Sequence, residues 1–348
     1  AGMTFGQGVQ WSKVKGIVLA LFFSPALGFF AAALLLVVLK SAFKNPALYR
    51  SPEGDNPPPW WIRGLLIVTC GGVSFAHGSN DGQKGMGLIM LILIGIVPGA
   101  FALNLMAPKA QWESIPGYSV VAASALHQPT VTPPSLELSV GRLEAFLEDR
   151  RYDPIVPEAL SVVVGELGNR LRVSSLQDIA AEERFQTRIL CVLIYRTWGE
   201  SVFQSHQSLT SEQRQALGLV AAQAEHLSKY VSPWVKLAVA VALGLGTMIG
   251  WKRVVVTVGE KIGKEHLSYG QGASAEAVAA LTILAADHFH MPVSTTHILS
   301  SGVAGTMYVH GSGLQRRTVL TLLSAWVLTL PVSMLLGAGS FLVIRWMV

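Results

Sequence analysis

The sequence predicts an all-α protein, a polytopic membrane helix bundle that carries a helical soluble insert. Hydrophobic residues make up 51% of the 348 residues and charged residues only 14%, whereas soluble domains usually carry about 25% charged residues. Residues 135–230 have an ordinary share of charge, and the flanking segments are nearly free of it. We therefore expect membrane helices over 1–103, a soluble, mainly helical insert over 104–232 and membrane helices over 233–348.

The apolar segments have the lengths that membrane helices need. A bilayer core about 30 Å thick requires roughly 20 apolar residues in helical form. Segments 16–39, 233–251 and 318–344 are candidates for uninterrupted spans. Segments 64–103 and 271–308 are also apolar, but polar stretches interrupt them at 77–85 and 288–297. We expect broken helices at these two places, because unwound backbone at membrane depth is tolerated where it lines a cavity or is buried in protein.

Basic residues indicate the topology. Lys and Arg gather in the loops 40–63 and 251–267, which the positive-inside rule places in the cytoplasm. One net crossing by 64–103 puts the insert on the periplasmic face, whereas two crossings would put the second basic loop outside, and we favour one. The formal charge of +5 then reflects topology rather than nucleic-acid binding.

The insert and the cysteines give weaker signals. The insert is rich in Pro, Ser and Ala up to about residue 135 and predicts a linker there, followed by amphipathic soluble helices. Cys70 and Cys191 are too few for a disulfide framework and lack metal-site spacing. We expect no signal peptide, because no basic segment followed by a short apolar core and a cleavage site is present.

The first polar stretch, His77–Gly85, reads HGSNDGQKG. Polar groups at membrane depth are costly and usually mark a pathway. Its three glycines favour unwinding, and the Asn80 amide oxygen and Asp81 carboxylate would then form a site for Na⁺ or a proton acceptor. The alternative is an ordinary loop between two helices. Lys84 either extends to the membrane surface or pairs with an anion, and the sequence leaves both open.

The second polar stretch, Met291–His297, reads MPVSTTH. Pro292 suits the start of a helix, and such a helix would direct free backbone N–H groups toward a cavity, beside three hydroxyl side chains. A helix N-terminus attracts anions, and phosphate suits this cluster of neutral donors. The alternative is that the hydroxyls only cap their own helix.

Other polar residues are open to two interpretations. Glu276 is a lone carboxylate among small residues, and it either binds a cation or proton or lies near the interface, where the helix dipole favours it. Asp287, His288 and His290 suggest a metal, but histidines two positions apart do not share a helical face, so we expect no metal site and no cofactor. Small residues over 233–251 and 298–306 predict helix-packing faces.

Two segments, FAHGSNDGQKGMGLIMLILIG and MPVSTTHILSSGVAGTM, closely resemble signatures of the PiT-type inorganic phosphate transporters, particularly the bacterial low-affinity branch. The resemblance covers most of 16–103 and 233–345 and is much weaker in the insert. It implies a transporter of inverted repeats, each with an Asn-Asp motif on a broken helix and a re-entrant hairpin. The implied substrate is inorganic phosphate, free or complexed with a divalent metal, and the coupling ion is H⁺ or Na⁺.

The resemblance also implies roles for individual residues. Phosphate-binding residues would be Ser294, Thr295, Thr296 and Asp81. Cation-binding residues would be Asn80, Asp81 and Glu276. Further candidates for the site are Ser79, Gln83, Lys84 and His297.

The chain departs from the family pattern, because it has one copy of each motif where the family has two. We therefore expect it to lack most of the first repeat, and a homodimer would supply a second half-site. The expected function is cation-coupled phosphate symport across the inner (plasma) membrane, in contact with the lipid bilayer. One alternative is a non-transporting membrane adaptor that acts through the insert. Another is a membrane enzyme using Asp81, Glu276 and His297, which we do not expect, since no nucleophile and base accompany them.

Overall fold

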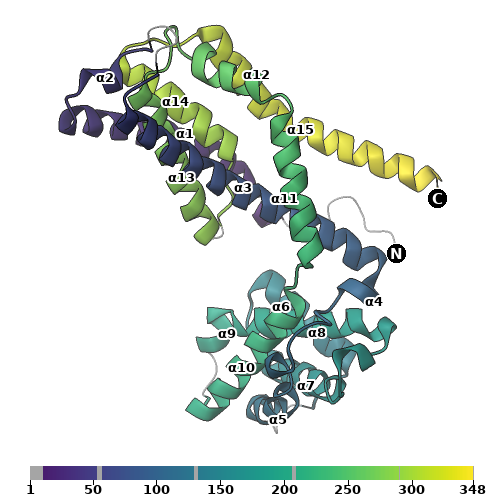
Figure 1. Ribbon diagram of the computed structural model, residues 1–348. Coiled ribbons are helices and arrows are strands. Elements are labelled where there is room, and N and C mark those ends of the chain that lie inside the picture. Colours follow the sequence, from purple (N-terminus) through teal and green to yellow (C-terminus); the bar gives the residue numbers. More distant parts are fainter. Residues whose placement is uncertain (1–10, 53–56, 129–131, 206–208, 290, 348) are drawn as a thin grey trace. The chain divides into compact units, whose positions relative to one another are not determined.

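The computed structural model describes all residues except 1–10, 53–56, 129–131, 206–208, 290 and 348. Helices and connecting turns make up the described part, which contains no β-strand, so the all-α prediction is confirmed (Figure 1). The chain divides into two compact units. We call residues 1–84 with 239–348 the membrane unit and residues 85–238 the insert unit. The predicted domain limits near residues 103 and 232 stay a prediction.

The membrane unit is built from long apolar helices. These are α1 (Trp11–Ala42), α2 (Pro46–Tyr49), α3 (Trp60–Ile96), α11 (Pro233–Met248), α12 (Trp251–Val256), a π-helical turn (Thr257–Lys261), α13 (Tyr269–His288), α14 (Thr295–His310) and α15 (Arg316–Met347), and α3 and α11 extend past its limits. By length and composition, Val14–Ala42 and Arg316–Ser340 suffice to cross a membrane, and Ser211–Ser228 and Pro233–Met248 would form a third span if that pair, bent by 56°, is counted as one.

The predicted break at 77–85 is wrong, because α3 runs as one helix from Trp60 to Ile96. The polar residues of this stretch have helical spacing, and His77, Asp81 and Lys84 form ion pairs at i,i+4 and i,i+3 that suit a continuous helix. None of the glycines in this stretch takes a positive φ. The interruption predicted at 288–297 is confirmed, since α13 ends at His288 and α14 begins at Thr295.

The insert unit is a helical bundle around one aliphatic core. Its elements are α4 (Pro98–Phe101), a 3-10 turn (Lys109–Gln111), α5 (Ile115–Leu126), α6 (Leu136–Asp149), α7 (Ile155–Arg170), a second 3-10 turn (Leu176–Asp178), α8 (Ala181–Trp198), α9 (Ser201–Ser205) and α10 (Ser211–Ser228). Helices α5, α6, α7, α8 and α10 all contribute buried side chains to the core.

The linker predicted up to about residue 135 is wrong, because α5 is a central helix of the insert unit. Ile115, Ala122 and Leu126 are fully buried in its core. The small residues that suggested a linker permit close packing instead: a Cβ atom at Gly168 of α7 would overlap the Ser119 side chain of α5. Composition alone therefore did not distinguish a flexible connection from a tightly packed helix.

One arginine of α8 joins the two ends of the insert unit. Arg188 Nη1 donates to the Ala102 carbonyl at 3.1 Å, where the chain enters the bundle, and to the Ser228 carbonyl at the end of α10. The Asn104 N–H also donates to the Leu227 carbonyl at 3.0 Å. Because both carbonyls end helices and have no intrahelical partner, the guanidinium satisfies groups that would otherwise be unpaired. The entry and exit of the insert are thereby held side by side.

We expect Arg188→Met to destabilise the insert unit by roughly 2–3 kcal/mol, since it leaves two buried carbonyls without a charged donor. Arg172→Met is the matched control, because Arg172 is exposed and its side chain forms no hydrogen bond in the described chain. Denaturant-dependent labelling of the buried Cys191, in a Cys70→Ser background, measures the transition. Equal midpoints for the two variants would contradict this role of Arg188.

Burial also governs the chemistry of Cys191. Desolvation raises the pKa of its thiol from the ordinary value of 9.0 to about 12, so the folded thiol stays protonated while the unfolded one ionises. The free energy of unfolding should therefore be highest below pH 9 and fall as the pH rises toward 12. Maleimide labelling at pH 8 should modify Cys191 only on unfolding, and rapid labelling of the folded chain would refute this.

Candidate functional site

Helix α1 packs closely against α14, the second helix of the α13–α14 hairpin. A Cβ atom at Gly28 of α1 would overlap the Ile298 carbonyl of α14, and one at Gly305 of α14 would overlap the backbone of Phe29. Gly302 contacts Ala32 in the same interface. Small residues let two backbones approach closely, as is common between membrane helices. The predicted packing face over 298–306 is therefore confirmed, and it fixes α14 beside α1.

The N-terminus of α14 is capped from two helices. Ser294 is the N-cap, and its Oγ accepts from the His297 N–H at 3.4 Å. The Ser294 N–H donates to the Oγ of Ser24, a buried residue of α1, also at 3.4 Å. For Ser294, the alternative of a hydroxyl that caps its own helix is therefore correct.

The two residues that follow the cap leave their backbone donors open. Within the described chain, neither the Thr295 N–H nor the Thr296 N–H has an acceptor. The Thr295 side chain is buried and the Thr296 side chain is exposed. Because α14 also places partial positive charge at this end, its first turn can receive an anion through two N–H groups and the neighbouring hydroxyls.

One face of α3 lies against α13. Val73 and Ala76 share an apolar cluster with α13 side chains and with Ile298 of α14, and Val293 packs against the same cluster. The segment before α14 and the middle of α3 are therefore neighbours. Asn80 follows Ala76 by one turn on this face and is 8% exposed. Its Oδ1 is buried without a hydrogen-bond partner, a costly arrangement for a polar atom.

Glu276 lies on the same contact between α13 and α3. Its Oε2 accepts from the Thr69 Oγ1 at 2.6 Å. Since α13 begins at Tyr269, Glu276 lies two turns into the helix, beyond the first turn in which the helix dipole acts. The dipole explanation therefore fails, and a carboxylate held between two helices remains.

Asp81 lies on a different face of α3 from Asn80. Its carboxylate contacts His77 Nε2 at 2.8 Å and Lys84 Nζ at 3.4 Å, and its side chain is 34% exposed. Among the residues that the structure describes, no hydrogen bond joins Asp81 to Ser294, Thr295 or Thr296. The structure thus pairs Lys84 with a side chain of its own helix, and the phosphate contact expected of Asp81 stays a prediction.

The remaining candidates are spread around this region. Gln83 Nε2 donates to the Asp287 Oδ2 at 3.1 Å. His297 stacks on Trp326 of α15, with ring centroids 4.4 Å apart, and its Nδ1 is buried without a hydrogen-bond partner. Ser79 is partly exposed. No three His, Cys, Asp or Glu side chains in the described ranges lie close enough to hold a metal, and His290 is outside those ranges.

Three residues with a part in this geometry were missed as site residues: Ser24, Thr69 and Asp287. Thr69 could have been found from spacing, because positions 69, 73, 76, 80 and 83 form one stripe of a continuous helix. That stripe is visible only if 77–85 is read as helical. Ser24 carries no such signal, since only the fold brings α1 to the start of α14.

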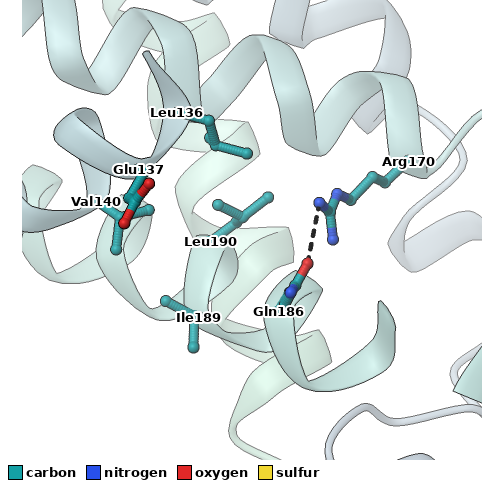
Figure 2. A pocket seen from close by; sticks show the side chains of 7 residues that line it. All are labelled: Leu136, Glu137, Val140, Arg170, Gln186, Ile189 and Leu190. Carbon is teal, nitrogen blue, oxygen red and sulfur yellow. Dashed lines mark hydrogen bonds between the residues drawn. The ribbon is translucent and has the colours of Figure 1, made fainter. Parts of the chain in front are cut away.

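The insert unit has a pocket of its own, with a volume of about 260 Å³. Its lining is mainly aliphatic and comprises Leu136, Glu137, Val140, Arg170, Gln186, Ile189 and Leu190 (Figure 2). The Arg170 guanidinium is already engaged by Glu166 at 2.7 Å and by Gln186 at 3.4 Å. With the Glu137 carboxylate in the lining and Glu166 already paired with Arg170, the pocket is a poor anion site.

Close packing between α1 and α14 predicts a size limit at Gly305. We expect Gly305→Leu to lower the thermal midpoint of the detergent-purified chain by roughly 5–10 °C, because the new side chain overlaps the rigid Phe29 backbone. Gly337→Leu in α15 is the control, since nothing lies within 4 Å of a Cβ atom there. An unchanged midpoint for Gly305→Leu would show that the helices pack differently.

Comparisons with known proteins agree with this architecture. The model of the phosphate transporter family matches residues 1–337. The chain is 36% identical to the low-affinity inorganic phosphate transporter PitA of Escherichia coli K12 over 94% of its own length and 68% of that protein, and the values for PitB of the same strain are the same. A low-affinity inorganic phosphate transporter of Buchnera aphidicola subsp. Acyrthosiphon pisum is also 36% identical, over 94% and 67%. No solved structure matches the chain.

These matches confirm the family that the two sequence signatures indicated. Its members are transporters rather than enzymes, which sets aside the acid–base enzyme alternative. The apolar helices of the membrane unit agree with a multi-pass protein of the inner membrane. The chain belongs to the phosphate transporter family.

Proposed function

We propose that this chain transports inorganic phosphate across the inner membrane and that the first turn of α14 binds the phosphate. The open N–H groups of Thr295 and Thr296 are the observation that carries this proposal. Two N–H groups and nearby hydroxyls suit an oxyanion that must be released again, because neutral donors bind it without a fixed ion pair. The names of the relatives support phosphate as the substrate.

In this proposal the coupling ion binds on the contact between α3 and α13. The unpartnered Oδ1 of Asn80 and the Glu276 carboxylate are two separate candidate positions for this ion, because Glu276 pairs with Thr69, eleven residues or roughly 16 Å of helix before Asn80. Either oxygen suits Na⁺, and Glu276 is the proton acceptor if the ion is H⁺. Asp81 is a second ligand for the ion or for phosphate after it leaves His77 and Lys84. Replacing Na⁺ by choline at constant pH, and then varying pH without Na⁺, distinguishes the two ions.

Other parts of the proposal concern the assembled transporter. Inverted repeats with a re-entrant α13–α14 hairpin would give each side of the membrane access to the phosphate in turn. A second half-site would come from another repeat or from a second copy of the chain. In this proposal the insert lies on the periplasmic face. Phosphate is transported either free or as a complex with a divalent metal.

A proline substitution tests the N-terminus of α14 directly. Thr295 is the first residue of the helix, and Ser294 before it is extended, with φ −99° and ψ 109°. Ser294 can therefore precede a proline, and a proline at position 295, the first residue of the helix, does not break the helix. Thr295→Pro removes the hydroxyl and the N–H, whereas Thr295→Val removes only the hydroxyl. We expect the KM for uptake of labelled phosphate to rise about tenfold more in Thr295→Pro than in Thr295→Val.

Thr329→Val serves as the control, because its hydroxyl bonds only to the Ala325 carbonyl of its own helix. It should leave the KM for phosphate unchanged. Equal KM values for Thr295→Pro and Thr295→Val would remove the N–H groups of α14 from the binding site. Equilibrium binding of phosphate to the purified proteins should rank the variants in the same order.

A further inference from the structure

We propose that Gln83 and Asp287 form a clasp that positions the start of α14 relative to Asn80, a role that rests on the proposed function. Gln83 Nε2 donates to Asp287 Oδ2 at 3.1 Å, across 204 residues of sequence. Gln83 lies three residues after Asn80 on α3, and Asp287 lies in the last turn of α13. Within the described residues, this bond is the one that joins 77–85 to the hairpin.

The clasp is the second of two polar links between α3 and α13. The first is the bond from Thr69 Oγ1 to Glu276 Oε2, at 2.6 Å. The second link follows the first in sequence on both helices, at 83 after 69 on α3 and at 287 after 276 on α13. Helices α3 and α13 therefore run in the same direction. The contacts between the links are apolar, through Val73 and Ala76 on α3 and small or aliphatic residues on α13.

This arrangement divides two tasks between the apolar and polar contacts. Apolar packing holds the helices together but is non-directional. Small apolar side chains alone therefore do not fix the rotation of α3 about its axis or its register along α13. A hydrogen bond to a carboxylate is directional and stronger than a neutral one. Two such links, about 21 Å apart along α3 by helical rise, fix both the register and the rotation of the helix pair.

Asp287 is well placed to transmit this register to the phosphate site. The chain leaves α13 one residue later, at His288, and reaches the Ser294 cap six residues after that. Restraining the end of α13 therefore restrains where α14 starts. On the other side, Gln83 is on the same stripe of α3 as Asn80. We infer that the clasp keeps the open N–H groups of Thr295 and Thr296 at a fixed position relative to the Asn80 amide oxygen.

An isosteric exchange of the two side chains tests the clasp. Gln83→Glu places two carboxylates together, and we expect it to raise the KM for phosphate uptake at least tenfold. Asp287→Asn keeps a neutral hydrogen bond, and about a threefold rise is expected. The double variant Gln83→Glu/Asp287→Asn restores an amide–carboxylate bond with its polarity reversed. Its KM should return to within about threefold of the unaltered chain, a coupling that independent sites would not show.

Cross-linking tests the geometry without reference to transport. In a Cys70→Ser/Cys191→Ser background, the pair Gln83→Cys/Asp287→Cys should be bridged rapidly by a short bifunctional thiol reagent, whose spacer replaces the reach of the two side chains. Lys84→Cys/Asp287→Cys is the matched control, because Lys84 is rotated by about 100° around α3 and faces Asp81. Equal rates for the two pairs would show that Gln83 does not face Asp287, which would overturn the clasp.

The outcomes separate this proposal from the proposed function. A chain that neither binds nor takes up phosphate would overturn the proposed function, and the positioning role with it. If the unaltered chain takes up phosphate but the double variant is no better than Gln83→Glu alone, the positioning role is wrong and the phosphate site stands. Rescue in the double variant, with selective cross-linking at 83 and 287, supports both.

Discussion

The start of α14 is the constraint on which the membrane unit depends. A helix that begins inside a bundle leaves backbone N–H groups that no carbonyl of its own can satisfy, and a low-dielectric environment makes each one costly. The structure satisfies some of these groups with Ser294 and Ser24 and leaves those of Thr295 and Thr296 open. Because Ser24 of α1 supplies part of the cap, α1 must lie close to α14, and the glycine contacts between the two helices allow this.

Helix α3 meets the same constraint in the opposite way. It keeps its backbone hydrogen bonds by remaining helical through HGSNDGQKG, and its polar side chains pair with one another or with α13. Helical geometry sorts them onto two faces: Asn80 and Gln83 face α13, while His77, Asp81 and Lys84 interact with one another. The Asn-Asp pair is therefore divided, and the two residues serve different environments although they are adjacent in sequence. A transport cycle that uses Asp81 would have to break its ion pairs first.

The insert unit has an aliphatic core, and Arg188 connects the two segments by which the chain enters and leaves that core. A domain inserted between membrane helices must hold its entry and exit together, and Arg188 does so by donating to carbonyls at both ends. The cost of burying its guanidinium is offset because each contact satisfies a carbonyl that ends a helix. The aliphatic pocket beside Arg170 is flanked by carboxylates, with Glu137 in its lining and Glu166 paired with the guanidinium.

The amino-acid sequence by itself determined the all-α class, the membrane helices around an insert and the family, because hydropathy and two short motifs are local properties. It also indicated a helix start near α14, although Pro292, taken as the first helical residue, lies three residues before the observed start at Thr295. Only the tertiary structure decided that 77–85 stays helical, that α5 is a core helix, and that Thr69, Ser24 and Asp287 belong to the site. The site contacts depend on partners more than two hundred residues away, such as Glu276 for Thr69 and Ser294 for Ser24. Glycine spacing and composition do not encode such partners, because the same residues that permit unwinding also permit close helix packing.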